Sequence, residues 1–257
     1  MIVDIDILAP LLTTPCCIAL LLTWFLLPKW RSLHNFIGLH QVLAGTLHLY
    51  SMAIFHILLL EFVIYSDVLI SVNGYLFMIA ASWSFCASLF AYLKLRLVYM
   101  QKISCEKTKT LILAYGMTTI LQVIIKGIVP ALYPPLTMFS QTVPSLLCVY
   151  HIETVNMILF VSVIASVFSS GNRSLREKGK RVIALVGVAI MCDMATIIYM
   201  LSMLPKFLVF EYDVEILKMM FAFRLIPQSI VLLFNRPTRK LWQEYLARRR
   251  HRRLNNF

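Results

Sequence analysis

The sequence predicts an all-α membrane protein, a seven-transmembrane helix bundle with a short amphipathic helix after the seventh helix. Three observations lead to this fold class. Hydrophobic residues make up 60% of the chain and charged residues only 14%, whereas soluble domains average roughly one half and one quarter. The apolar residues are gathered into seven runs. Lys and Arg are concentrated in every second connection between these runs.

Each apolar run is long enough to cross a bilayer as a helix, which takes roughly 20 residues. The separating stretches are short, so residues 1–257 are expected to form a single domain. The third run is the longest, and we expect its helix to tilt or to project past the bilayer. The predicted membrane helices cover approximately residues 7–27, 36–60, 69–99, 110–133, 145–168, 181–204 and 215–234.

The seventh run ends at Asn235-Arg236-Pro237, and an amphipathic stretch follows it. We expect a surface helix over 236–247 and a basic tail over 248–257. Apolar side chains spaced i, i+1, i+4 and i+5 share one helical face, and here they are Leu241, Trp242, Tyr245 and Leu246. The other face carries Arg239, Lys240, Gln243 and Glu244. This pattern is typical of a helix that lies on a membrane surface.

The distribution of Lys and Arg predicts the orientation of the chain. The first, third and fifth connections and the C-terminal tail hold nineteen of these residues, and the N-terminal segment and the remaining connections hold only Lys206. Because basic connections stay in the cytoplasm, we expect a plasma-membrane protein with its N-terminus outside and its C-terminus inside. The net charge of +12 then faces the inner leaflet. We interpret the Arg-rich run of the tail as a contact with anionic lipid and expect no nucleic-acid partner.

Residues 223–246 resemble the end of the seventh helix and the surface helix of rhodopsin-like G-protein-coupled receptors. The matching residues are Phe234, Asn235 and the run Arg239-Lys240-Leu241-Trp242. The family's Asn-Pro-x-x-Tyr motif is replaced here, in order, by Pro227, Gln228 and Val231. The resemblance implies a divergent member of that family, of the serpentine chemoreceptor or orphan receptor type.

Other helices resemble the same family at single positions. Asn35 matches a common Asn of the second helix, and Gly45 stands where the family carries a sodium-binding Asp. In the third helix, Arg96 of the run KLRLVYM stands where the family has Asp-Arg-Tyr. In the sixth helix, Cys192 matches the Cys of Cys-Trp-x-Pro. The family's usual outer disulfide is not expected, because Ser71 stands near the position of its third-helix Cys.

The resemblance implies a heterotrimeric G protein as the cytoplasmic partner, bound in a basic cleft that opens when the sixth helix swings out. For Arg96, the alternative is an interfacial Arg that extends toward the lipid headgroups. The G-protein-facing candidates are Arg96, Arg173, Arg176, Lys178, Lys180, Arg239 and Lys240.

Ionisable side chains at membrane depth are costly and are functional hypotheses by default. Asp193 and Arg224 fall on the sixth and seventh helices, both roughly 17 Å above the inner surface at 1.5 Å per residue. Lys126 and Glu153 fall on the fourth and fifth helices, roughly 24–27 Å above it. We expect two ion pairs. Either both pairs only fasten helices together, or one of them holds the resting state and a ligand competes for that pair.

The expected ligand is extracellular and small or lipid-like, because about six residues precede the first helix in this sequence and we expect no peptide-capturing domain. The ligand-pocket candidates are Tyr75, Trp83, His151, Glu153, Asp193, Tyr199 and Arg224. His48 and His56 are eight residues apart, too far to bind a metal ion without a third ligand. We expect no metal, no cofactor and no catalytic site, since no zinc cluster, phosphate loop or Ser/His/Asp order occurs.

Two alternatives to a signalling receptor stay open. A small seven-helix transporter or channel would have helices broken by Gly and Pro and internal repeats, and the eight glycines of the chain argue against it. A non-signalling decoy receptor would account for the altered family motifs.

Overall fold

The computed structural model describes residues 5–62, 67–96, 106–124, 139–169 and 214–254, and isolated positions between 180 and 198. These residues form seven α-helices, one 3-10 turn and no strand, which confirms the all-α class for the described part of the chain. The elements are α1 (Ile5–Leu26), η1 (Pro28–Trp30), α2 (Leu33–Phe62), α3 (Asp67–Arg96), α4 (Glu106–Val123), α6 (Phe139–Ser169), α8 (Val214–Phe234) and α9 (Arg236–Leu254).

The described helices coincide with six of the seven predicted membrane helices. Helices α1, α2, α3, α6 and α8 begin and end within six residues of the expected positions. Most of the predicted sixth helix, 181–204, lies outside the described residues, as does the end of the fourth, beyond residue 124. The seven-span arrangement therefore stays a prediction.

The described helices have the composition of a membrane protein. The segments Leu8–Leu26, Val72–Leu93 and Cys148–Ser169 are long and apolar enough to cross a bilayer. In α6 the buried residues recur at three- and four-residue intervals, and the opposite face exposes large apolar side chains such as Ile158 and Phe168. Soluble monomers rarely expose apolar patches of this extent, so we interpret this face as lipid-facing.

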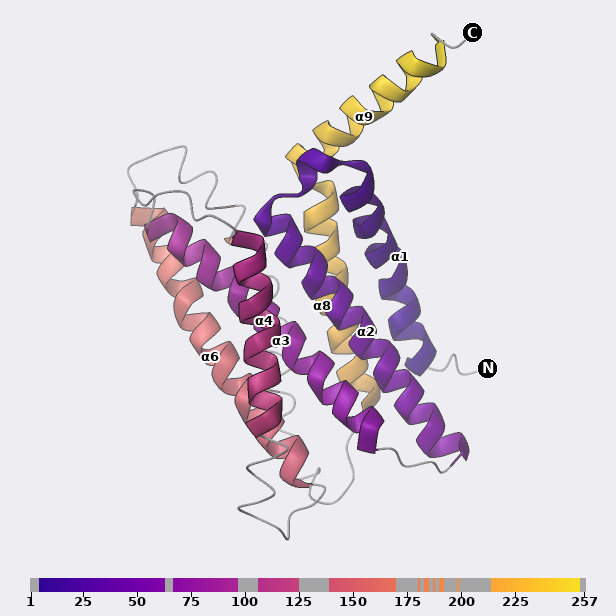
Figure 1. The fold of residues 1–257 in the computed structure, drawn as a ribbon, viewed down its shortest axis with the longest axis vertical. Helices are drawn as coiled ribbons and strands as arrows, with labels where there is room; N and C mark the ends of the chain where they lie inside the picture. The colour runs from indigo at the N-terminus through magenta and orange to yellow at the C-terminus, as the bar shows by residue number, and fades with distance from the viewer. Residues whose placement is uncertain are drawn as a thin grey trace.

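Helix α3 lies in the middle of the bundle and packs against α2, α4 and α6. Helix α8 packs against α1 and α2, and its last residue leads through Asn235 into α9. The turn η1, the start of α4 and helix α9 lie at one end of the bundle, and the first residues of α1 lie at the opposite end (Figure 1). We call the first of these the basic end, because its exposed side chains include Lys29, Arg31, Lys109, Arg239 and Lys240.

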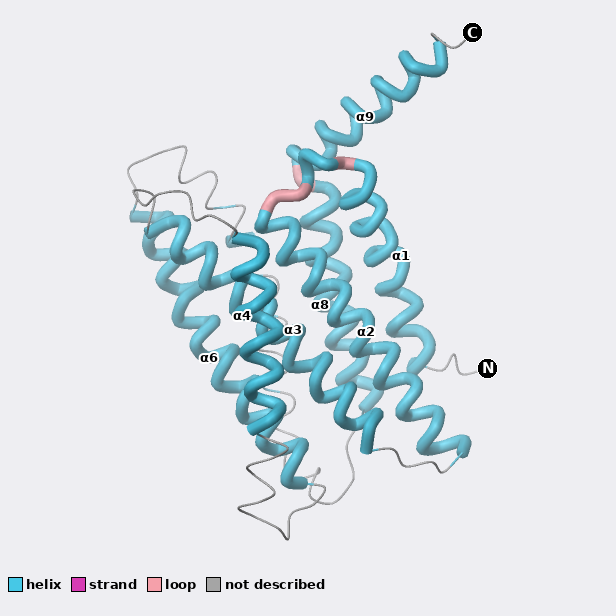
Figure 2. Tube along the Cα trace, in the orientation of Figure 1, coloured by secondary structure: helices cyan, strands magenta, loops and turns pink. Residues whose placement is uncertain are grey.

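Helix α9 leaves the bundle at an angle to α8 (Figure 2). It extends to Leu254, beyond the expected end at residue 247, so most of the expected basic tail is helical. An exposed ion pair between Arg248 and Glu244, one turn apart at 3.9 Å, spans the expected boundary between surface helix and tail. Consecutive Arg residues are good helix formers, and the helix continues through them.

Candidate functional site

Two glycines of α2 allow α8 to approach closely. A Cβ atom on Gly38 would lie 2.6 Å from a Leu232 methyl group, and one on Gly45 would lie 2.6 Å from a Leu225 methyl group. The two glycines are seven residues apart, and so are the two leucines. Each leucine therefore fills the space above a glycine, the kind of close contact that small residues allow between membrane helices. Gly45 leaves no room for the Asp that rhodopsin-like receptors carry at the position it resembles.

Polar residues alternate with these glycine–leucine contacts. The side-chain amide nitrogen of Gln228 donates a hydrogen bond to the side-chain oxygen Oε1 of Gln41, and both residues are buried. One further step along the interface, His48 of α2 lies within electrostatic range of Arg224 of α8. We call the whole α2–α8 interface, with its alternating apolar and polar contacts, the α2–α8 seam. A buried polar pair between membrane helices contributes about 0.6 kcal/mol on average and fixes the register of the two helices.

Arg224 lies at the end of the α2–α8 seam that is farther from the basic end. It is buried, with 3% of its surface exposed. Its neighbour His48 also interacts with the backbone and side chain of Asn73 in α3. His48 of α2 thus interacts with both α3 and α8. The predicted partner Asp193 lies outside the described residues, so the ion pair Asp193–Arg224 stays a prediction.

Glu153 lies on the buried face of α6, with 1% of its surface exposed. The Asn156 side-chain amide donates hydrogen bonds to Glu153 Oε2 at 2.8 Å and to Ser84 Oγ of α3 at 3.1 Å. This polar group joins α3 to α6 inside the bundle. Lys126, the predicted partner of Glu153, lies outside the described residues.

The remaining pocket candidates occupy different surroundings. Tyr75 is half-buried, and its hydroxyl lies 3.2 Å from Thr119 Oγ1 of α4. His151 is exposed on the side of α6 opposite Glu153 and contacts the Tyr150 ring edge-to-face. Tyr199 lies outside the described residues. Among the candidates that the structure describes, only Glu153 and Arg224 combine charge with nearly complete burial.

Trp83 belongs to a packed aromatic cluster that the sequence did not predict. The His40 ring stacks on Trp83 with centroids 4.8 Å apart, and Phe36 meets His40 at 4.4 Å. The Tyr115 hydroxyl lies 3.4 Å from His40 Nδ1. The cluster joins α2, α3 and α4, and Trp83 itself is fully buried. The structure thus places Trp83 inside helix packing, where it fastens three helices together.

At the basic end, η1 is fastened to the junction of α8 and α9. The Trp30 Nε1–H donates a hydrogen bond of 2.8 Å to Thr238 Oγ1, and Thr238 donates in turn to the Leu232 carbonyl at 3.0 Å. Asn235 caps α9, because its Oδ1 accepts from the Thr238 backbone N–H at 2.9 Å. The Asn35 side-chain amide donates to the Trp30 carbonyl at 2.7 Å. The two Asn residues that carry the family resemblance thus both hold this junction together.

The apolar face of α9 contacts the base of the bundle. Leu241, Trp242 and Tyr245 pack against a buried cluster contributed by α1, η1, α2 and α8, which includes Leu20, Leu27, Trp30 and Leu232. Leu246 is 46% exposed and does not belong to this cluster.

The G-protein-facing candidates are described only in part. Lys180, Arg239 and Lys240 are exposed. Helix α3 ends at Arg96, whose side chain lies outside the described set. Arg173, Arg176 and Lys178 also lie outside it. Among the described residues, no group of three or more His, Cys, Asp or Glu side chains could hold a metal ion.

Comparison with known proteins adds no family assignment. No protein-family model matches the chain, and no curated protein matches it significantly.

Proposed function

We propose that the chain is a seven-transmembrane signalling receptor of the G-protein-coupled type, with its N-terminus outside the plasma membrane and a small or lipid-like ligand. The junction of α8 and α9 carries this proposal. The last bundle helix ends at Phe234, and after Asn235 the amphipathic helix α9 packs its apolar face onto the bundle. This is the arrangement that the resemblance of residues 223–246 implies.

The buried charges supply a route for ligand action. Arg224 and Glu153 lie on the buried faces of α8 and α6. A small ligand with polar groups would compete for these side chains or for their partners and so shift the population between two packings of the bundle. The α2–α8 seam would stay fixed while the sixth helix moves. Helix α9 would contact anionic lipid, and the basic residues beside it would contact the G protein.

A transporter of broken helices is less well supported. Helix α2 runs unbroken from Leu33 to Phe62 through both glycines of the seam, and α8 runs unbroken through Pro227. The glycines serve close helix packing instead of interrupting a helix.

The proposal is tested with the purified chain in lipid vesicles together with heterotrimeric G proteins of each main class. We expect basal nucleotide exchange above that of vesicles without the chain. We also expect Arg96→Ala to lower this exchange, and Lys109→Gln, a charge loss at the exposed start of α4, to leave it unchanged. A folded chain that accelerates exchange in no class would contradict the receptor proposal and favour a decoy.

A further inference from the structure

We propose that Arg31 and Lys107, held over the ring of Trp24, form a binding site for the phosphate group of an anionic lipid at the basic end of the bundle. The site joins the first connection to the start of α4 and is separate from α9. It requires only that the chain lies in a membrane, and it is independent of signalling.

Both cations are held in place over one aromatic ring. Arg31 Cζ lies 5.7 Å from the Trp24 ring centroid, and Lys107 Nζ lies 5.4 Å from the same centroid. Arg31 donates from Nε to the Trp24 carbonyl at 2.9 Å and from Nη2 to the Phe25 carbonyl at 3.3 Å. Lys107 Nζ donates to the Arg31 carbonyl at 2.6 Å. The last turn of α1 thus orients Arg31, and Arg31 in turn orients Lys107.

Neither positive charge is neutralised by the described parts of the chain. The ion pair that occurs among those residues, Arg248–Glu244, lies on α9. An Arg side chain carries five N–H donors and a Lys ammonium three, and the contacts above use two and one of them. Arg31 is exposed and Lys107 half-exposed, so both side chains are accessible from outside the bundle. Guanidinium and ammonium groups with open donors are the usual partners of phosphate oxygens.

The position of the site indicates a lipid rather than a free anion. The segment Leu8–Leu26 is long and apolar enough to cross a bilayer, so a cation pair just after it lies at the level of the headgroups. Trp residues are enriched at that level. Directly before the site, α1 exposes Leu22 and Phe25 at 51% and 67% of their surfaces. These side chains offer an apolar surface to acyl chains, which a free phosphate ion would not use.

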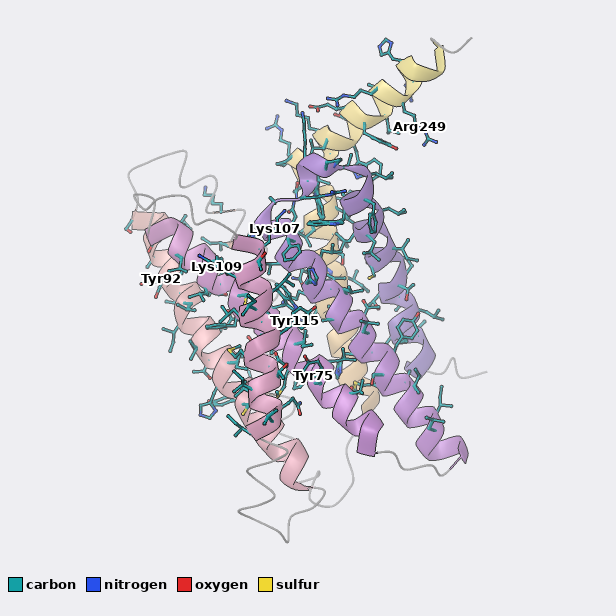
Figure 3. The ribbon with its side chains drawn as sticks, viewed as in Figure 1. Tyr75, Tyr92, Lys107, Lys109, Tyr115 and Arg249 are labelled. Carbon is teal, nitrogen blue, oxygen red and sulfur yellow. The ribbon has the colours of Figure 1, made fainter. Side chains whose placement is uncertain are left out.

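The two cations come from different segments, Arg31 from the connection between η1 and α2 and Lys107 from the start of α4. Figure 3 shows Lys107 at the end of α4 nearest η1, and Arg249 far out on α9. Lys109 is exposed two residues along α4, with no contact to Trp24 among the described interactions. These positions supply matched control substitutions, since each removes one charge from the same end of the protein.

The test uses the purified full-length chain in neutral detergent, titrated with dioctanoyl phosphatidic acid while the melting temperature is followed. We expect a saturable rise with this lipid and none with dioctanoyl phosphatidylcholine or inorganic phosphate at equal concentration. Arg31→Gln and Lys107→Gln should each raise the half-saturating lipid concentration about fivefold, because one basic residue near a membrane surface contributes about that much to binding. Lys107→Arg, Lys109→Gln and Arg249→Gln should leave it unchanged.

Two outcomes would overturn the site. One is an equal rise in melting temperature with dioctanoyl phosphatidic acid in the wild-type chain and in both Gln variants, provided that the melting temperatures without lipid match the wild-type value. The other is an equal rise with inorganic phosphate, which would show a simple anion effect. If a Gln variant melts early without lipid, the Lys107→Arg variant decides the matter, because loss of the response there would also contradict the proposal.

Discussion

The methyl groups of Leu225 and Leu232 occupy the space that two glycines leave on α2. Both leucines are 1% exposed, so neither has an open direction into which it can move. At the scale of single residues, the contact between α2 and α8 therefore depends on the absence of two Cβ atoms.

Gly45→Ala is expected to lower the stability of the folded chain. The new Cβ would meet Leu225 methyl carbons at 2.6 and 2.9 Å, and overpacking of this kind costs about 1–3 kcal/mol. Adding Leu225→Ala removes the clash, so the double variant should lose less stability than the two single variants predict together. Melting temperatures in one detergent measure these changes.

Gly116→Ala is the matched control, because no atom lies within 4 Å of its added Cβ. Replacing a helix-interior Gly by Ala stabilises a helix by roughly 0.5–1 kcal/mol, so this variant should melt no earlier than the wild-type chain. Equal behaviour of the Gly45 and Gly116 variants would mean that α2 and α8 are not in close contact.

At the scale of whole elements, α9 is fastened at its start and extends away from the bundle at its end. Thr238 and Asn235 hold the first turn by hydrogen bonds. Leu241, Trp242 and Tyr245 hold the next two turns by apolar packing. Beyond these turns the described side chains of α9 are exposed.

This difference along α9 predicts that Trp242→Ser is more damaging than Leu246→Ser. Trp242 packs against the buried cluster that contains Leu20 and Trp30, whereas Leu246 lies outside it. Loss of the burial of a large apolar side chain costs about 1.5–3 kcal/mol when burial is complete, and Trp242 is half-buried. Hydrogen exchange of the α9 amides should therefore accelerate on the order of tenfold in the Trp242 variant only. Similar acceleration in both variants would show that α9 is held by its first turn alone.

The positions of the helices could be predicted from the sequence, but their contacts could not. Bilayer thickness sets the length of an apolar run, so the ends of α1 and α8 follow from composition. Which face of a helix contacts which neighbour depends on the rotation of the helix about its axis and on its position along the bundle. Both are set by contacts between residues that are far apart in the sequence. The hydrogen bond from Trp30 to Thr238 spans 208 positions. The stacking of Trp83 on His40 had no local signal in the sequence either.

At the scale of the whole molecule, the described basic side chains gather at one end of the bundle. The described basic residues of η1, α4 and α9 lie at one end, and the first residues of α1 lie at the other (Figure 1). If the bundle crosses a membrane, the two termini lie on opposite sides of it.

An epitope tag at the N-terminus should accordingly be accessible to antibody on intact cells, and a tag after Phe257 only after permeabilisation. Asn172, in the sequon Asn172-Arg173-Ser174, belongs to the connection expected in the cytoplasm and should carry no glycan. Mass analysis of the expressed protein checks the glycan. A glycan on Asn172, or a C-terminal tag that is accessible on intact cells, would contradict the predicted orientation and indicate the opposite one.

The α2–α8 seam restricts which substitutions the chain can accept during evolution. Each glycine on α2 tolerates a larger side chain only when the leucine facing it becomes smaller. In diverging descendants of one ancestral gene, positions 38 and 232, and positions 45 and 225, are therefore expected to change as pairs. Paired substitutions at these positions, in which one side chain grows and the facing one shrinks, would then indicate common ancestry. They would do so even in chains that have kept none of the short motifs by which relatives are usually traced.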